Sequence, residues 1–180
     1  NHSYDTYLTL GDLKSAQNTL EQLCRIAAND LEVMQRKANA YLRCRFVQGE
    51  KGKQLRQWIQ KIIKLAPDEP GSYDLLARYY ALQRLNTKSL STSQHCTETH
   101  PNNPGSWYNY GFCLFRAGHF SGAAEAMFKA YKLYPNDYAI CWALYEILPF
   151  AHRSDELEPL IEKMLAMFPE RWSMWAIAGR

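Results

Sequence analysis

Residues 104–137 read PGSWYNYGFCLFRAGHFSGAAEAMFKAYKLYPND, and this stretch decides the fold. Its second proline, Pro135, stands 34 residues from Pro101 on one side and from Pro169 on the other, and Pro67 continues the series. A fixed period of this length is typical of a solenoid, in which each repeated unit buries its apolar face only against its neighbours. The spacing predicts an array of repeated units, in which other positions should recur in phase.

Other positions do recur in phase. With each proline at position 32, the units span residues 70–103, 104–137 and 138–171, and a truncated unit covers 172–180. Positions 4, 7 and 11 are mostly large and apolar: Tyr73, Trp107, Cys141 and Trp175; Leu76, Tyr110, Leu144 and Ala178; Tyr80, Leu114 and Leu148. Because these positions share one stripe of a helix, each unit should open with an amphipathic helix. A second helix should end before the proline, which lacks an N–H and disfavours helical geometry in the preceding residue.

Seven residues of the 104–137 unit resemble the signature of the tetratricopeptide repeat (TPR) family. They are Trp107, Tyr110, Gly111, Leu114, Ala123, Ala130 and Pro135, and the family pattern is W, L, G, Y, A, F, A and P. The resemblance implies an all-α fold, a right-handed superhelix of antiparallel helix pairs (an α-solenoid), formed as a single domain over residues 1–180.

Two earlier segments fit the pattern less strictly. Residues 1–30 resemble the second helix of a partial repeat, and residues 31–69 resemble a full helix pair. In the latter we expect a turn from Gln48 to Lys53 that is about five residues longer than in the family pattern. The chain begins without a methionine and stops within the first helix of a unit, so we expect it to be a fragment of a longer protein.

Composition limits the classes of protein. The 180 residues are 47% hydrophobic and 13% aromatic, which is ample for burial. No run of about 18 apolar residues predicts a transmembrane helix, and no signal-peptide pattern occurs. The five cysteines are odd in number and form no CxxC motif, which favours packed, reduced cysteines. We expect an intracellular protein, of the cytoplasm or nucleus, that does not bind membranes.

The sequence offers little for catalysis. It lacks a metal-ligand pattern such as HExxH, a strand-turn-helix elbow for a nucleophile, and a glycine loop that could hold phosphate. His95, Cys96 and His100 are close in sequence but have no second pair of ligands. Gly49 and Gly52 are assigned to the predicted turn. We therefore expect no enzymatic activity, no metal or cofactor, and no small-molecule substrate.

The family resemblance implies that positions 2, 5, 6, 9, 12 and 13 of the first helices face a concave groove. These positions hold Tyr108, Asn109, Phe112, Phe115 and Arg116 in one unit and Trp142, Ala143, Glu146, Pro149 and Phe150 in the next. Helices that are apolar nearly all round should be covered on both faces. Either the groove takes a partner's helix or extended segment, or later helices or another domain cover it.

A second candidate surface is basic. Residues 36–64 carry nine basic side chains and one acidic one, whereas the segments before and after them are net acidic. The proposed basic patch consists of Arg36, Arg43, Arg45, Lys51, Lys53 and Arg56. It could bind nucleic acid or an acidic partner, or it could be a solvated face. Nucleic acid is favoured less, because aromatic residues are not interleaved with the charges as stacking would require.

The family also implies a test for binding acidic chaperone tails. Family members that bind these tails use a clamp of side chains from three successive repeats: Lys and Asn in the first, a central Asn in the second, and Lys and Arg in the third. Asn109 fits the centre, but Asp74, Arg78, Ala139 and Ala143 do not fit the flanks. We therefore expect a different ligand. The leading hypothesis is a non-catalytic scaffold for protein–protein interaction within an intracellular multi-subunit assembly.

Residues 86–100 form the most polar predicted helix, NTKSLSTSQHCTETH. Ser89, Ser93 and Cys96 stand where the family pattern has alanine, phenylalanine and alanine. Because serine and threonine are mediocre helix formers, we expect this helix to contribute little burial. It should be the most mobile part of the array or be completed by another chain, and its hydroxyl groups are candidate phosphorylation sites.

Overall fold

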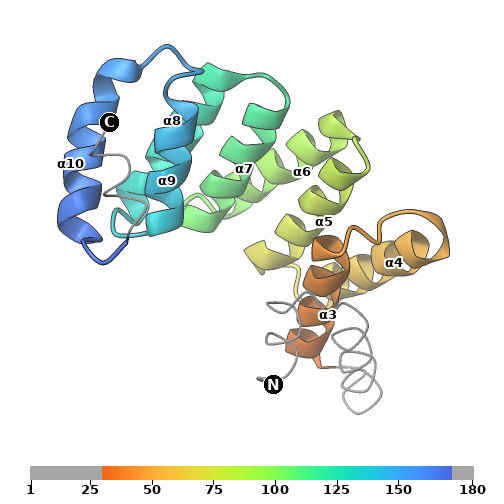
Figure 1. The fold of residues 1–180 in the computed structure, drawn as a ribbon. Coiled ribbons are helices and arrows are strands. Elements are labelled where there is room, and N and C mark those ends of the chain that lie inside the picture. Colours follow the sequence, from red (N-terminus) through yellow and green to blue (C-terminus); the bar gives the residue numbers. More distant parts are fainter. Residues whose placement is uncertain (1–29, 172–180) are drawn as a thin grey trace. The chain divides into compact units, whose positions relative to one another are not determined.

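A computed structural model describes residues 30–171 of the chain. Within this range it contains eight α-helices, one 3-10 helix and no strand, which confirms the predicted all-α class (Figure 1). The elements are α3 (Leu31–Arg43), α4 (Gly49–Leu65), α5 (Pro70–Leu82), α6 (Asn86–Thr99), α7 (Pro104–Arg116), α8 (Phe120–Leu133), α9 (Tyr138–Ile147), η1 (Ser154–Glu156) and α10 (Leu157–Met167). None of these helices is long and apolar enough to cross a membrane. Predictions for residues 1–29 and 172–180 lie outside the described residues.

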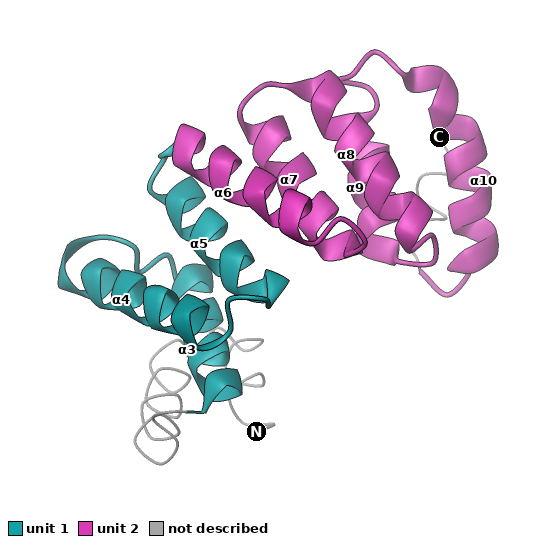
Figure 2. Ribbon diagram, turned by 180° about the vertical axis from the view of Figure 1, so that it is seen from behind, with its two compact units in different colours: residues 1–85 teal, residues 86–180 magenta. Residues whose placement is uncertain are grey.

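The chain divides into two compact units, residues 1–85 and residues 86–180 (Figure 2). In the first unit, α3, α4 and α5 pack on one another. In the second, α7 packs against both α6 and α8, while α9 packs mainly against α8 and α10. The division falls between α5 and α6, inside the unit predicted at 70–103. The predicted repeat boundaries and the single-domain organisation stay predictions.

Local sequence signals explain where the helices begin and end. Pro70 and Pro104 occupy the first turns of α5 and α7, where a missing N–H breaks no helical hydrogen bond. The side chain of Asp137 caps α9 by accepting from the N–H groups of Ala139 and Ile140. The helices α4, α8 and α10 each end two residues before a proline of the 34-residue series, as the sequence predicts.

Position 4 of the unit links each first helix to the proline before it. In α7 the indole Nε1 of Trp107 donates a hydrogen bond to the carbonyl oxygen of Pro101 at 2.7 Å. In α9 the thiol of Cys141 donates to the carbonyl oxygen of Pro135 at 3.5 Å. A hydrogen-bond donor at this position therefore satisfies a backbone acceptor that helix geometry leaves open.

The turn between α3 and α4 differs from the prediction. It spans residues 44–48, and the residues from Gly49 to Lys53 form the start of α4 instead. The extra residues lengthen the helix, because α4 has 17 residues whereas α8 has 14. Gly52 is buried under Val47: a Cβ atom on Gly52 would lie 2.2 Å from the carbonyl oxygen of Val47. This glycine therefore allows a close approach inside a helix and does not form a turn.

The polar helix α6 forms and packs against α7 through small side chains. Its buried residues are Ser89, Ser93, Cys96 and Thr97. The Oγ atom of Ser93 donates to the carbonyl of Leu90 at 3.0 Å, and Oγ1 of Thr97 donates to that of Gln94 at 2.7 Å. Hydroxyl groups bonded to their own helix can be buried at little cost. Mobility, completion by another chain and phosphorylation of this helix stay predictions.

The second unit has its core where α7, α8, α9 and α10 meet. Met127, Leu144, Leu148 and Met164 are fully buried there. Gly111 lets α7 approach α8, since a Cβ atom on it would lie 3.0 Å from Cγ of Met127 and 3.2 Å from the carbonyl oxygen of Ala123. The missing side chain of Gly111 thus brings the two helices into close contact.

Candidate functional site

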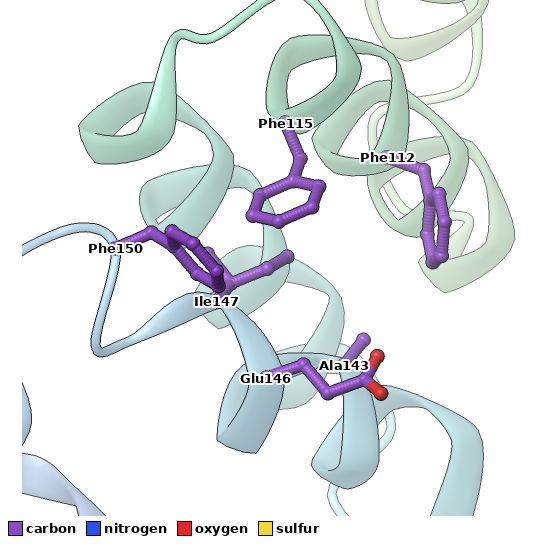
Figure 3. A pocket seen from close by; sticks show the side chains of 6 residues that line it. All are labelled: Phe112, Phe115, Ala143, Glu146, Ile147 and Phe150. Carbon is purple, nitrogen blue, oxygen red and sulfur yellow. The ribbon is translucent and has the colours of Figure 1, made fainter.

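A cavity of about 310 Å³ opens between α7 and α9 in the second unit. It is lined by Phe112, Phe115, Ala143, Glu146, Ile147 and Phe150 (Figure 3). The three phenylalanines and Glu146 are among the predicted groove residues, and Ala143 is expected on the same face. The structure therefore gathers the centre of the predicted groove into one pocket.

Helix periodicity explains the lining residues. Phe112 and Phe115 are three positions apart on α7, while Ala143 and Ile147 are four positions apart on α9, so each pair shares one face of its helix. The helix α9 packs mainly on α8 and α10, and these faces of α7 and α9 line the pocket between them. Ile147 is not among the predicted groove residues, although its spacing from Ala143 could have identified it.

Phe150 reaches the pocket from a turn and not from a helix. The repeat pattern predicts it on the first helix of its unit, but α9 ends at Ile147. Pro149 has no N–H to continue the helical ladder, and the chain turns back through His152, whose φ is 56°. The N–H of Arg153 donates to the carbonyl of Leu148 at 3.0 Å and closes this turn. The prediction of a helical Phe150 is therefore wrong, while its place beside the groove residues holds.

Three phenylalanine rings form one wall beside the cavity. The ring centroid of Phe115 lies 5.3 Å from that of Phe150 and 5.4 Å from that of Phe120, and Phe120 lies 5.5 Å from Phe150. These distances are typical of favourable aromatic pairs. Phe120 is the first residue of α8, and it is not among the predicted groove residues because the groove positions of the family pattern lie on the first helix of each unit. The rings tie α7, α8 and the turn after α9 together.

The other predicted groove residues lie outside the pocket lining. Trp142 is half-buried, with its ring centroid 5.9 Å from Tyr138 and 5.5 Å from Tyr145. Tyr108 packs its ring 5.5 Å from that of Phe112, while Asn109 is half-buried and Arg116 is exposed. Trp142 thus belongs to an aromatic row along α9, and its role in partner binding stays a prediction.

Glu146 is the charged residue of the lining. Its side chain is exposed, and it forms no hydrogen bond or ion pair with the part of the chain that the structure describes. The remaining lining consists of phenyl rings and aliphatic groups, which neither bind metal nor attack a substrate. The nearby thiol of Cys141 is fully buried, and burial raises its pKa to about 11, with the charge of Asp137 adding to the shift. A protonated, buried thiol is a poor nucleophile.

The basic patch is spread over α3, the following turn and α4. Arg43, Arg45 and Arg56 are exposed, and Arg36 forms an ion pair with Glu32 at 2.6 Å. Lys51 and Lys53 lie in the first turns of α4, which corrects their predicted place in a long turn. The ammonium group of Lys51 lies 4.4 Å from the ring centre of Phe46, and that of Lys53 is 3.9 Å from Glu50.

Polar side chains join α3 to α5 at positions that correspond to the groove. The guanidinium of Arg78 donates to Asn39 at 2.7 Å and lies 3.5 Å from the carboxylate of Asp74. Burial raises the pKa of Asp74, and the charge of Arg78 only partly offsets this. Within residues 30–171, two buried side-chain atoms lack a hydrogen-bond partner: Oδ1 of Asp74 and Nε2 of Gln35.

Within the described residues, no group of three or more His, Cys, Asp or Glu side chains is placed to hold a metal ion. The cysteines there, Cys44, Cys96, Cys113 and Cys141, are free thiols. Cys96 lies 3.3 Å from the hydroxyl of Ser106, and Cys113 lies 3.2 Å from that of Ser89. Both thiols thus contact a neighbouring helix.

Comparison with known proteins shows which of them resemble this arrangement of helices. A tetratricopeptide repeat family model matches residues 5–30, within the segment predicted as a partial repeat. A thermophilic TPR protein of Thermus thermophilus has a TM-score of 0.78 at 17% identity, over 96% of this chain and 92% of that one. MamA of Desulfovibrio magneticus RS-1 has a TM-score of 0.62 at 15% identity, over 94% and 93%. MamA of strain MSR-1 has a TM-score of 0.56 at 20% identity, over 94% of both chains.

These TM-scores show the fold, an α-solenoid of the TPR type, while the low sequence identities leave the ligand open. No curated protein sequence is significantly similar to the chain. The sequence match at the N-terminal end and the structural likeness over nearly the whole length agree with each other and with the repeat period. The chain therefore has the fold of tetratricopeptide repeat proteins, and its residues 5–30 match a model of that family.

Proposed function

We propose that this chain is a non-catalytic scaffold that binds a helix or extended segment of a protein partner at the pocket between α7 and α9, within an intracellular assembly. Repeat solenoids of this kind present extended binding surfaces, so the TPR-type fold and the family match at residues 5–30 support protein binding in general. The particular site and the assembly are parts of the proposal.

The pocket is the observation that carries the proposal. Phe112 and Phe150 line it and are 40% and 53% exposed, although large apolar side chains usually avoid water when they can. The cavity lies at the lower end of the range of about 300–1,000 Å³ that ligand pockets occupy. A concave apolar site of this size suits one or two anchoring side chains of a partner.

Selection from a random 12-residue peptide library, with the full 180-residue chain as bait, tests the proposal. Recovered peptides would be labelled and their affinity measured by fluorescence polarisation. Replacing both Phe112 and Phe150 with alanine should weaken binding by about tenfold or more, because buried anchors dominate interface energies. Both side chains are substantially exposed, so the variant should still fold, which circular dichroism would check.

Tyr134→Ala is the matched control. Tyr134 is also aromatic, is 51% exposed and lies in the same unit, but it is not part of the pocket lining. The control should bind the peptides like the unchanged chain. The proposal fails if no recovered peptide depends on Phe112 and Phe150, or if Tyr134→Ala weakens binding to the same degree.

The basic patch supports a second candidate, the binding of nucleic acid or an acidic partner. Arg43, Arg45 and Arg56 are exposed and have no acidic partner within the described segment, unlike Arg36. Charge reversal at Arg43 and Arg56 should weaken a polyanion ligand, and its affinity should fall steeply with salt. Peptides held in the aromatic pocket should tolerate the same increase in salt much better.

A further inference from the structure

We infer that the partner segment joins an apolar anchor to an arginine or lysine, and that this cation lies between the carboxylate of Glu146 and the ring of Phe112. The inference rests on the proposed function and specifies the chemistry of the partner at the same pocket. A segment with an acidic residue at this place should be rejected.

The carboxylate of Glu146 has no cationic partner within the described residues. Two other carboxylates of the same unit are paired, because Arg153 donates to Glu125 at 2.6 Å and to Glu156 at 3.0 Å, whereas the exposed Glu162 has no such partner within the described residues. Glu146 has no such partner within residues 30–171, although it borders an apolar cavity. A carboxylate left unpaired beside a binding surface attracts a cation and repels an anion on approach, so it selects partners by charge.

The ring of Phe112 provides a second contact for the cation. It is exposed, and Figure 3 shows the carboxylate of Glu146 on the Phe112 side of the pocket, away from Phe150. A cation within about 6 Å of a ring centre is attracted to the ring face. The described part of the same unit already uses this contact three times, for example where Lys129 lies 4.1 Å from the ring centre of Trp107.

The opposite end of the pocket suits the apolar anchor. Phe115, Ile147 and Phe150 line it, and no charged side chain of the lining is present there. An apolar side chain would bury the exposed surface of Phe150 and displace water from the phenylalanine wall. Arginine fits the other end better than lysine does, because its planar group can stack on a ring and bind a carboxylate at once.

A charge swap tests this inference on the peptides selected with the unchanged chain. These peptides should be enriched in arginine or lysine near a large apolar residue. Glu146→Gln should weaken them by about two- to fivefold, as expected for the loss of an exposed ion pair, and Glu146→Lys by roughly tenfold. A peptide in which that arginine is replaced by glutamate should bind the Glu146→Lys variant better than it binds the unchanged chain.

Glu162→Lys is the control, because Glu162 is an exposed carboxylate on α10 outside the pocket lining. It changes the net charge equally and should leave the affinities within about twofold, since exposed charges far apart are screened by salt. A Phe112→Leu variant keeps apolar surface but removes the ring face, so it should reduce the preference for arginine over an uncharged residue.

The outcomes separate this inference from the function on which it rests. Peptides that depend on Phe112 and Phe150 but show no basic residue, or that respond equally to Glu146→Lys and Glu162→Lys, overturn the charge inference and leave the pocket as a binding site. Absence of any pocket-dependent peptide overturns both. Self-association in sedimentation that disappears in the Phe112 and Phe150 double variant would identify a second copy as the occupant and also overturn the inference.

Discussion

The two units use their corresponding helices differently. In the first unit, α3 and α5 are in direct contact, and Arg78 on α5 bonds to Asn39 on α3 at 2.7 Å. In the second unit, α7 and α9 are separated by aromatic side chains, and a cavity of about 310 Å³ is left between Phe112 and Phe150. Positions that the family resemblance assigns to one groove therefore become a polar contact in one unit and an apolar pocket in the other.

The difference shows that side-chain chemistry, and not helix order, decides where a site can form. A charged contact such as that of Arg78 depends on geometry and leaves no apolar surface for a ligand. The phenylalanine rings between α7 and α9 leave a cavity with largely apolar walls, which can take an apolar side chain of a ligand. Two kinds of substitution test the comparison: those that break the polar contact between α3 and α5, and those that fill the pocket between α7 and α9.

Removing the cation from the polar contact should have the largest effect. Arg78→Met keeps much of the apolar stem but leaves Asp74 largely buried without its positive partner and Asn39 without its donor. The expected loss in the free energy of unfolding at neutral pH is about 2 kcal/mol, below the value for fully buried pairs because the Arg78 side chain is 40% exposed. Urea unfolding of the full chain measures it.

A double variant provides the control. Replacing Asp74 with leucine in the Arg78→Met background removes the unpaired carboxylate as well, and apolar pairs often substitute for buried ion pairs at little cost. The double variant should therefore recover most of the lost stability. If it is as unstable as Arg78→Met alone, the packing of the Arg78 stem, and not its charge, holds α3 to α5.

Filling the pocket should make the second unit resemble the first. Ala143 lines the cavity from α9, so the larger side chain of Ala143→Leu can enter space that is already present. The free energy of unfolding should change by less than about 1 kcal/mol, since cavity filling offsets strain, whereas peptide binding at the pocket should be lost. Thermal unfolding and fluorescence polarisation measure the two effects.

Ala124→Leu is the matched substitution outside the cavity. Ala124 is fully buried in the core of the same unit and does not line the pocket. There the added methyl groups meet packed neighbours and should cost about 1–3 kcal/mol. Equal destabilisation by both substitutions would contradict the presence of usable space beside Ala143.

Periodicity alone predicts much of this fold. The prolines 34 residues apart mark where α4, α8 and α10 end, and Gly111 marks the close approach of α7 and α8. These features depend on short-range chemistry: a missing N–H in proline and a missing Cβ in glycine. Both can be identified from one residue and its position in the unit.

The departures from the pattern depend on contacts between segments. Glycine is common in turns, which predicts a turn at Gly52, but the role of this residue is set by Val47, which crosses the start of α4. The composition of α6 predicts little burial, yet its buried face needs side chains that are small and internally bonded more than it needs apolar ones. Neither fact follows from a residue type alone.

The candidate site could be predicted only in part for the same reason. Phe112, Phe115, Glu146 and Phe150 follow from positions in the repeat, and the structure brings them to one cavity. The row formed by Tyr138, Trp142 and Tyr145 depends on packing along α9. Phe120 joins the wall through Phe115 and through Phe150, which the turn after α9 places beside it. Tertiary packing sorted the predicted residues into those that line the cavity and those that do not.

The smallest predicted effect concerns the pH dependence of the polar contact. Burial raises the pKa of Asp74, so the folded chain holds a proton there at pH values where the unfolded chain has released it. Stability contributed at this site is therefore greatest below the pKa of the unfolded state, about 4, and falls as the pH rises through the higher pKa of the folded state. Ionised Asp74 is thus a destabilising group at neutral pH.

Asp74→Asn removes this ionisation while keeping an oxygen that can accept from Arg78. Compared with the unchanged chain, the variant should gain stability as the pH rises from about 4 to about 7, because only the unchanged chain must then bury a negative charge. Urea unfolding at several pH values gives the difference directly. If the stability of Asp74→Asn relative to the unchanged chain decreases as the pH rises, the attraction to Arg78 outweighs the cost of burying the charge. The ionised carboxylate of Asp74 would then stabilise the contact between α3 and α5.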